Sequence, residues 1–367
     1  MRVGILGSSP LALLDAIDAA ASGHDVVVFE GTAGLGGAWG VTSFAGFVDV
    51  EIGCHLLERE SAGYDRLRAA GVDLAPLDPQ PMTALRPGLR QAYVSPIAAA
   101  ARLAYQPVAR VLRRSSATTV EWKRRVALAA KELRDAITDR SPVLGPVGGA
   151  GRMVATLATA ARHAGAEIRT DTTVTQIDLS DAAPVVHTDQ GAETFDLMIV
   201  TAACRPATVF VDGTPLDGPV RRRRFEHRLL ALPTGSVRPH SYWRFPRDPL
   251  LQRSASITVN ASRRSGDDHE LVLVSVSPDA AASVEALVAR LARHGLVEPG
   301  TTPIDHRVVD YTGVDAADTL VTALGHRRDV LVRRSYGDLT RSIVDSPRLD
   351  AGELGSPRPS LRTESAS

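Results

Sequence analysis

The stretch that decides the fold is MRVGILGSSPLALLDAIDAAASGHDVVVFE, which runs from Met1 to Glu30. An apolar run over residues 2–6 predicts a buried strand, and another over residues 25–29 predicts a second strand. Between them, leucine, isoleucine and alanine recur at helical spacing, and Gly23 lies where a helix would end. The order strand, turn, helix, strand is typical of a βαβ unit.

The turn after the first strand carries a variant of the G-x-G-x-x-G/A pattern of dinucleotide-binding proteins. Its three defining positions hold Gly7, Ser9 and Ala12, with Pro10 opening the helix. The first glycine permits a tight turn, the second lets backbone approach a pyrophosphate, and the third lets helix and strand pack closely. Ser9 departs from this pattern. Its side chain could crowd the phosphates or hydrogen-bond to them, and the sequence leaves both alternatives open.

Two further features extend this nucleotide site along the chain. Glu30 ends the second predicted strand, where a carboxylate can accept hydrogen bonds from both hydroxyls of a ribose. A second glycine run follows at once and includes Gly36 and Gly37. Glycines at this position let the backbone approach the ribityl-pyrophosphate of a flavin nucleotide. The combination predicts FAD as the cofactor.

The composition excludes several other classes of protein. The 367 residues contain 42 basic and 42 acidic residues, so the net charge of zero gives no reason to expect nucleic acid as a partner. The only two cysteines, Cys54 and Cys204, form neither a disulfide framework nor a zinc motif. No apolar run approaches the ~20 residues of a membrane span. We expect a cytoplasmic protein with a small-molecule substrate, no metal and no membrane span; a homodimer stays open.

The rest of the chain predicts a discontinuous nucleotide-binding domain with two insertions. Glycine-rich sequence at residues 145–151 opens a predicted helix, and apolar strand runs follow at residues 167–169, 172–179, 195–203 and 329–333. We predict an α/β fold of the glutathione-reductase-like type, with a Rossmann-like FAD-binding domain over residues 1–57, 145–206 and 326–346. Residues 58–144 are expected to form an inserted helical lobe, residues 207–325 a sheet-containing substrate domain, and residues 347–367 a disordered tail.

Six short segments along the chain resemble motifs of the FAD-dependent amine oxidase and phytoene desaturase superfamily, and they occur in the same order as in that superfamily. They are Gly7 to Glu30, Gly34 to Gly37, Pro146-x-Gly148-Gly149, Val174, Asp196 to Ala203, and Gly337-Asp338. The resemblance implies that the strand carrying Val174 lies against the adenine of FAD. It also implies that Gly337 and Asp338 lie near the flavin and a phosphate.

Within this superfamily, the segment Gly53-Cys54-His55 is similar to the UDP-galactopyranose mutase-like and protoporphyrinogen oxidase-like branch. The resemblance implies that His55 lies near the flavin ring, where it is the candidate catalytic residue. The segment from Tyr242 to Arg253 is similar to substrate-domain strands of that branch. The resemblance makes Tyr242 and Arg253 candidate substrate contacts. The mutases end in a Gly-Arg pair, whereas this chain has Gly337-Asp338.

Three functions remain open from the sequence. The first is an FAD-dependent oxidoreductase that transfers a hydride from a small or glycosylated metabolite to the flavin. Several amine oxidases use a lysine-bound water at the flavin, but no lysine follows Lys131 in this chain. The second is a non-redox flavin-dependent sugar mutase, and the third is a non-catalytic partner subunit in which Ser9 marks a degenerate nucleotide site.

Overall fold

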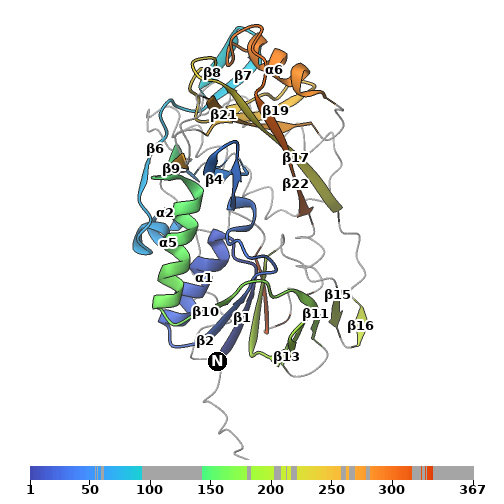
Figure 1. The fold of residues 1–367 in the computed structure, drawn as a ribbon. Coiled ribbons are helices and arrows are strands. Elements are labelled where there is room, and N and C mark those ends of the chain that lie inside the picture. The colour runs from blue at the N-terminus through green and yellow to red at the C-terminus, as the bar shows by residue number, and fades with distance from the viewer. Residues whose placement is uncertain are drawn as a thin grey trace, which may run out of the picture.

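The computed structural model describes most of the first two segments of the expected nucleotide-binding domain, part of its third segment, and most of the substrate domain (Figure 1). The described residues are 1–53, 55, 57–58, 62–92, 143–179, 183–201, 208–211, 213–215, 221–257, 262–263, 269–277, 282–315, 324, 327 and 329–333.

A five-stranded parallel sheet forms the centre of the lower half of the molecule in Figure 1. Its strands, in spatial order, are β10 (Glu167–Arg169), β2 (Asp25–Phe29), β1 (Arg2–Leu6), β14 (Leu197–Thr201) and β23 (Val330–Arg333). The first two strands of the chain are neighbours with Arg2 opposite Asp25, as the βαβ prediction requires. Strands from the beginning, middle and late parts of the chain therefore share one sheet.

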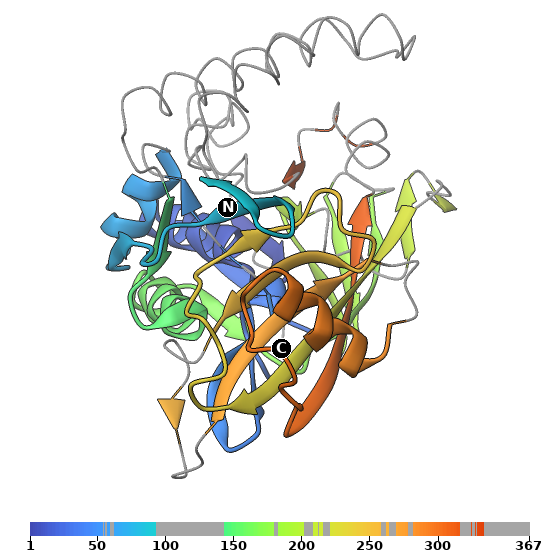
Figure 2. The same cartoon turned by 90° about the horizontal axis from the view of Figure 1, so that it is seen from above.

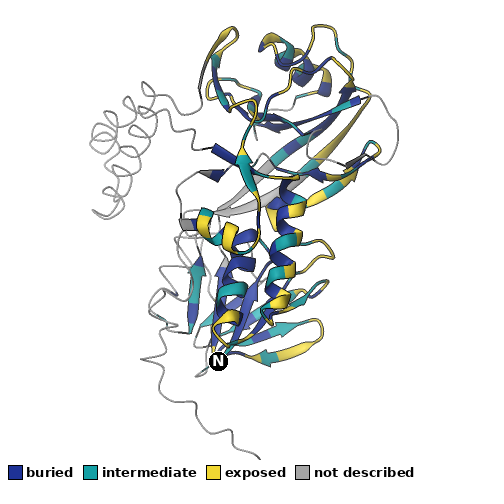
Figure 3. Ribbon diagram, turned by 90° about the vertical axis from the view of Figure 1, so that its left-hand side faces the viewer, coloured by how far each residue is buried: buried dark blue, intermediate teal, exposed yellow. Residues whose placement is uncertain are grey.

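Two helices cover one face of this sheet, and their burial explains why they form there (Figure 3). Helix α1 (Pro10–Ala21) presents the fully buried small side chains of Ala12, Ala16 and Ala19 to the strands, which permits close packing. Helix α5 (Gly149–His163) lies beside α1 and shares a second apolar cluster with it, which includes Leu14 and Leu157.

A second five-stranded sheet covers the opposite face of the parallel sheet. Its strands, in spatial order, are β13 (Gly191–Thr194), β12 (Val185–Thr188), β11 (Val174–Asp178), β15 (Thr208–Val211) and β16 (Thr214–Pro215). Phe29 of the parallel sheet packs with Phe195 and Ile177 in the apolar layer between the two sheets. The glutathione-reductase-like α/β fold is therefore confirmed, with helices on one face of the parallel sheet and a small sheet on the other.

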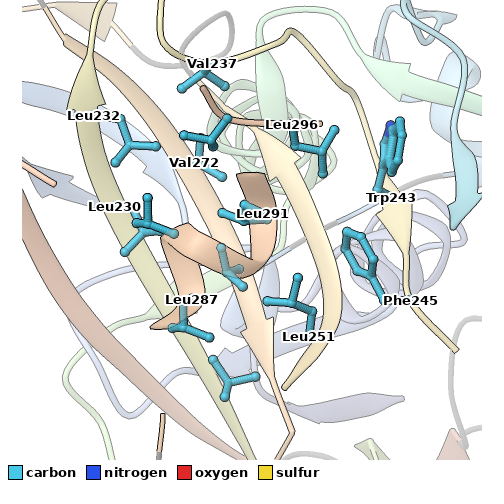
Figure 4. Packing of buried hydrophobic residues seen from close by; sticks show 14 of the residues in the cluster. Leu230, Leu232, Val237, Trp243, Phe245, Leu251, Val272, Leu287, Leu291 and Leu296 are labelled. Carbon is cyan, nitrogen blue, oxygen red and sulfur yellow. The ribbon is translucent and has the colours of Figure 1, made fainter. Parts of the chain in front are cut away.

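A seven-stranded sheet forms the upper half of the molecule. Its strands, in spatial order, are β22 (Asp305–Asp315), β17 (Arg221–Pro233), β21 (His269–Val276), β19 (Leu251–Ser256), β18 (Trp243–Arg244), β7 (Met82–Arg86) and β8 (Leu89–Ala92). Helix α6 (Val284–Arg293) lies over its outer face (Figure 2). Leu287 and Leu291 of α6 pack there against Leu230 and Val272 of the strands (Figure 4).

The other face of the seven-stranded sheet packs against a small sheet that connects the two halves. That sheet contains β20 (Ser262–Arg263), β4 (Phe47–Glu51) and β3 (Val41–Phe44). Phe44, Phe47 and Val50 share an apolar cluster with Leu229 and Leu273 of the large sheet. The second glycine run ends inside the short 3-10 helix η1 (Gly37–Trp39), and Gly40 alone lies between η1 and β3.

The expected helical lobe contains several strands where the structure describes it. Helix α2 (Ala62–Ala69) is present, but β5 (Leu57–Glu58) and β6 (Leu74–Pro76) pair with β9 (Val143–Pro146), and β7 and β8 extend the seven-stranded sheet. The expectation of a helical lobe is therefore wrong where these strands lie, because the segments pair with β9, with β18 and with each other. Residues 93–142 lie outside the described residues, as does the tail at 347–367.

Candidate cofactor and substrate site

The first glycine turn has the geometry that the fingerprint demands. Gly7 has a φ of 79°, which favours glycine, and its N–H donates to the Phe29 carbonyl at 2.8 Å. Ser9 has a φ of −59° and is the N-cap of α1, where its Oγ accepts from the Ala12 N–H at 3.3 Å. Pro10 opens the helix, and no acidic residue lies in its first turn. The positive end of α1 therefore stays available for a pyrophosphate.

Ser8, which is not one of the defining positions of the glycine pattern, connects this turn to both later parts of the nucleotide site. Its side chain is fully buried, and its Oγ donates to Glu30 Oε2 at 2.6 Å. The same oxygen accepts from the Gly36 N–H at 2.9 Å. One hydroxyl therefore joins the first turn, the ribose-binding carboxylate and the second glycine run.

The Glu30 carboxylate receives four hydrogen bonds from its own chain. Oε2 accepts from the N–H and hydroxyl of Ser8, and Oε1 accepts from the N–H and hydroxyl of Thr32 at 3.2 and 3.0 Å. Because a carboxylate has about four lone-pair sites, a ribose hydroxyl must replace one of these partners. Thr32 is exposed and its single hydroxyl proton can donate instead to the Gly34 carbonyl at 2.8 Å, so it can be released without leaving a buried group unpaired.

The strand that carries Val174 begins beside Glu30. The Thr172 N–H donates to the Glu30 carbonyl at 2.9 Å, and the Asp171 N–H donates to the Thr32 carbonyl at 3.2 Å. Val174, the first residue of β11, is partly buried two positions later. Its location is compatible with the adenine contact that the resemblance implies.

The second glycine run requires glycine at Gly36 and leaves open space at Gly37. A Cβ on Gly36 would lie 3.0 Å from Val154 Cγ2 and 3.1 Å from the Gly40 nitrogen, whereas a Cβ on Gly37 would meet nothing within 4 Å. Both have positive φ, at 108° and 56°. Together with the free end of α1 and the Glu30 carboxylate, this cradle fits an extended dinucleotide such as FAD.

A cavity of about 320 Å³ lies where the second glycine run meets the seven-stranded sheet, and its size suits a small ligand. The nucleotide-binding half contributes Trp39, Glu51, Gly53, His55 and the segment from Gly145 to Gly148. The strands and loops of the other half contribute Ala75 to Pro79, Pro239 to Ser241 and Ala255 to Ile257. Ala150 of α5 completes the lining.

His55 is held in one orientation and one tautomer at this cavity. Its Nε2–H donates to the Ala38 carbonyl at 2.8 Å, and its ring stacks on Trp39 with centroids 3.9 Å apart. Burial lowers the pKa of His55 to about 3, so the imidazole is neutral and Nδ1 is an acceptor. A Cβ on Gly53 would lie 2.4 Å from Nε2, which explains the glycine in the Gly-x-His segment.

Two other titratable residues of the cavity were missed as site residues. His240 is 2% exposed, donates from Nδ1 to the Arg238 carbonyl at 2.8 Å and accepts at Nε2 from the Ser254 hydroxyl at 2.9 Å. Burial lowers its pKa to about 4. Glu51 Oε1 accepts from the Ala150 N–H at 2.9 Å, in the first turn of α5. No sequence motif marks His240, whereas Glu51 lies in the segment that leads to His55.

The two candidate substrate contacts lie beside the cavity and do not line it. Tyr242 is 4% exposed and follows Ser241, while Arg253 is exposed on β19, two residues before Ala255. Gly337 and Asp338 lie outside the described residues, so their predicted place near the flavin stays a prediction.

Comparison with known proteins agrees with this geometry. Residues 126–294 match the family model of the flavin containing amine oxidoreductases. The matched part is somewhat under half of the chain, and it supports the resemblance to the FAD-dependent amine oxidase superfamily. The same match supports FAD as the cofactor and agrees with the resemblance found in the sequence.

Several solved structures share the fold over nearly the whole chain. A putrescine oxidase bound to putrescine has a TM-score of 0.58 and 14% identity, with 92% of this chain and 94% of that chain covered. A reduced UDP-galactopyranose mutase has a TM-score of 0.57 and 14% identity, with 92% and 90% covered. An oxidoreductase from Methanosarcina mazei has a TM-score of 0.58 and 14% identity, with 84% and 87% covered.

These similarities do not single out one branch of the amine oxidase superfamily. The oxidase and the mutase match to nearly the same extent, so the fold is shown and the reaction is not. No curated protein sequence matches the chain. Within the described residues, no helix is both long and apolar enough to cross a membrane.

Proposed function

We propose that this flavoprotein is an oxidoreductase that removes a hydride from a small or glycosylated metabolite bound in the cavity beside His55. The observation that carries the proposal is the continuous connection between the nucleotide turn and that cavity. Ser8 bonds to Gly36, η1 begins at the next residue, and Trp39 of η1 lines the cavity and stacks on His55. When bound, FAD supplies the acceptor of the two electrons.

Some residues of the chain would hold the cofactor, and others would orient the substrate. Gly7, Ser9, Glu30 and Gly36 would hold the nucleotide half of FAD, with Val174 beside the adenine. The neutral His55 would accept a hydrogen bond at Nδ1, because its Nε2–H is committed to Ala38. Its stacking on Trp39 fixes the direction of that bond.

Part of the wall of the cavity is apolar. Apolar side chains of Trp39, Pro239 and Ile257 form part of its wall, and the neutral state of His240 adds no charge there. An apolar wall beside the reacting groups favours transfer of a hydride over exchange with water. Arg253 and Tyr242 would contact the substrate at the edge of the cavity.

An anaerobic titration tests this function directly. The FAD-loaded protein is mixed with candidate amines, alcohols and glycosides without oxygen, and the flavin absorbance is followed. An oxidoreductase substrate bleaches the visible flavin bands, and His55→Ala slows the bleaching while His163→Ala, an exposed histidine at the end of α5, does not. Turnover of a sugar nucleotide only after reduction with dithionite, with no net bleaching, would instead support a mutase and overturn the proposal.

A further inference from the structure

We propose that Arg244 and Arg253 bind an anionic group of the substrate, a carboxylate or a phosphate. This inference rests on the proposed function and names the substrate class of the same site. The two arginines lie directly opposite each other on the antiparallel strands β18 and β19. Directly opposite side chains on one sheet face have Cβ atoms about 4.5–5.5 Å apart.

The pairing of Arg244 with Arg253 is unfavourable unless a negative charge neutralises the two guanidinium groups. Like charges directly opposite each other on neighbouring strands destabilise a sheet. Both arginines are exposed, and neither forms an ion pair with an acidic residue in the part of the chain that the structure describes. Elsewhere the described arginines often have acidic partners, such as Arg228 with Glu226 and Arg290 with Asp248.

The pair lies on the inner face of the seven-stranded sheet, toward the cavity. Side chains alternate along a strand, so Arg253 shares its face with Ala255 and Ile257, which line the cavity. Trp243 and Ser254, one residue along, are directly opposite each other, and Trp243 packs in the apolar cluster beneath α6. The arginines therefore point to the side where the substrate would lie.

Polar side chains continue the row on both sides of the two arginines. Thr83 lies opposite Arg244, and Ser275 lies opposite Arg253. Beyond Ser275 comes His227, which is hydrogen-bonded to the Ser275 hydroxyl at 2.7 Å. This polar row runs across the inner face of the seven-stranded sheet. The neighbouring pair on the same face, Ala255 and Leu273, is apolar and buried.

The positive charge of Arg253 acts on His227 of the polar row and on His55 of the cavity. After burial, its positive charge is the second cause that lowers the pKa of His227 to about 4, and it contributes to the low pKa of His55. The charge is therefore close enough to the cavity to act on a bound substrate. Guanidinium groups bind carboxylates and phosphates through two parallel hydrogen bonds, which suits a pair of neighbouring arginines.

Calorimetric titration of the FAD-loaded protein with inorganic pyrophosphate and with malonate tests the inference. The titrations are done at constant ionic strength in chloride, with wild type, Arg244→Gln and Arg253→Gln. Arg293→Gln is the matched control, because Arg293 is an exposed arginine of α6 on the opposite face of the sheet. Wild type and the control should bind one anion per chain, and each of the other variants should bind at least tenfold more weakly.

Pyrophosphate and malonate distinguish a phosphate from a carboxylate as the group that the arginines bind. The flavin absorbance shows whether FAD is bound, so failure of the anion site can be told apart from failure of the proposed function. Tighter binding of pyrophosphate assigns a phosphate, and tighter binding of malonate assigns a carboxylate. Equal binding by all four proteins, or no binding of either anion by wild type, overturns the anion site. The FAD content of the same samples is read from their absorbance, so a yellow protein that binds neither anion overturns this inference alone.

Discussion

The Ser8 hydroxyl donates to the Glu30 carboxylate at 2.6 Å from a position with no exposed surface. Hydrogen bonds to charged groups contribute about 1.5–3 kcal/mol each. Because the same hydroxyl accepts from the Gly36 N–H, its loss releases both the carboxylate and the second glycine run. The geometry of the FAD site therefore depends on a buried residue that the glycine pattern does not specify.

Ser8→Ala should weaken FAD binding about tenfold or more, as measured by quenching of flavin fluorescence during titration. Ser22→Ala is the control, since the Ser22 hydroxyl bonds only to its own helix, at the Asp18 carbonyl, and is exposed. Unchanged affinity in Ser8→Ala would show that the Ser8 link does not shape the nucleotide site.

Ser9 gives a second prediction about the same turn. Ser9→Gly removes an N-cap that glycine replaces at a cost of only a few tenths of a kcal/mol, so FAD binding should be equal or tighter. Ser9→Leu places a large side chain where the pyrophosphate passes and should abolish binding. If Ser9→Leu binds FAD as wild type does, the cofactor does not lie along this turn.

The fully buried Asp15 of α1 should be essential for stability. Its carboxylate accepts from Arg333 Nε and Nη2 at 2.8 and 2.7 Å and from Arg66 at 3.0 Å, which ties α1 to β23 and α2. Asp15→Ala removes the buried carboxylate that both guanidinium groups contact, so the free energy of unfolding should fall by about 3–5 kcal/mol. Asp25→Ala, at an exposed ion pair with Arg2, should change it by about 1 kcal/mol or less in urea titrations.

The buried histidines predict how stability depends on pH. Burial lowers the pKa of His227 to about 4 and that of His240 to about 4, below the ordinary value of about 6.5 for an unfolded chain. The unfolded state therefore binds more protons between pH 6.5 and 4, and stability falls as the pH falls through this window. Each histidine contributes up to about 1.4 kcal/mol per pH unit.

Urea titrations between pH 7 and 4 measure this effect. His240→Asn should reduce the slope of unfolding free energy against pH, and His163→Asn, an exposed histidine, should leave the slope unchanged. A slope in His240→Asn that equals the wild-type slope would mean that His240 is protonated in the folded protein.

The sequence predicted the nucleotide half well because its signals are local. The turn at Gly7, the acid at Glu30 and the glycines at Gly36 and Gly37 each require a particular backbone geometry, and the structure has that geometry. The cavity could not be predicted in the same way. His240 and Ser254 are fourteen positions apart and meet only because β19 folds back beside the loop that carries His240.

The same reason explains the misjudged strands at residues 74–92. β7 is short, and it forms a strand through parallel pairing with Trp243 and Arg244, more than 150 residues away. A short strand that forms by long-range pairing has too few residues to show a clear alternation of polar and apolar side chains. Its sequence therefore does not distinguish it from a loop or from the end of a helix. Likewise, the opposition of Arg244 and Arg253 follows from strand register, which the sequence does not show.

The stoichiometry of FAD in the purified protein tests the central claim most directly. The protein is incubated with excess FAD, desalted and denatured by heat, and the released cofactor is identified and counted against protein concentration. The arrangement of Gly7, Ser8, Glu30 and Gly36 predicts one FAD per chain. A colourless protein that retains no FAD after reconstitution would contradict the site and the oxidoreductase function built on it.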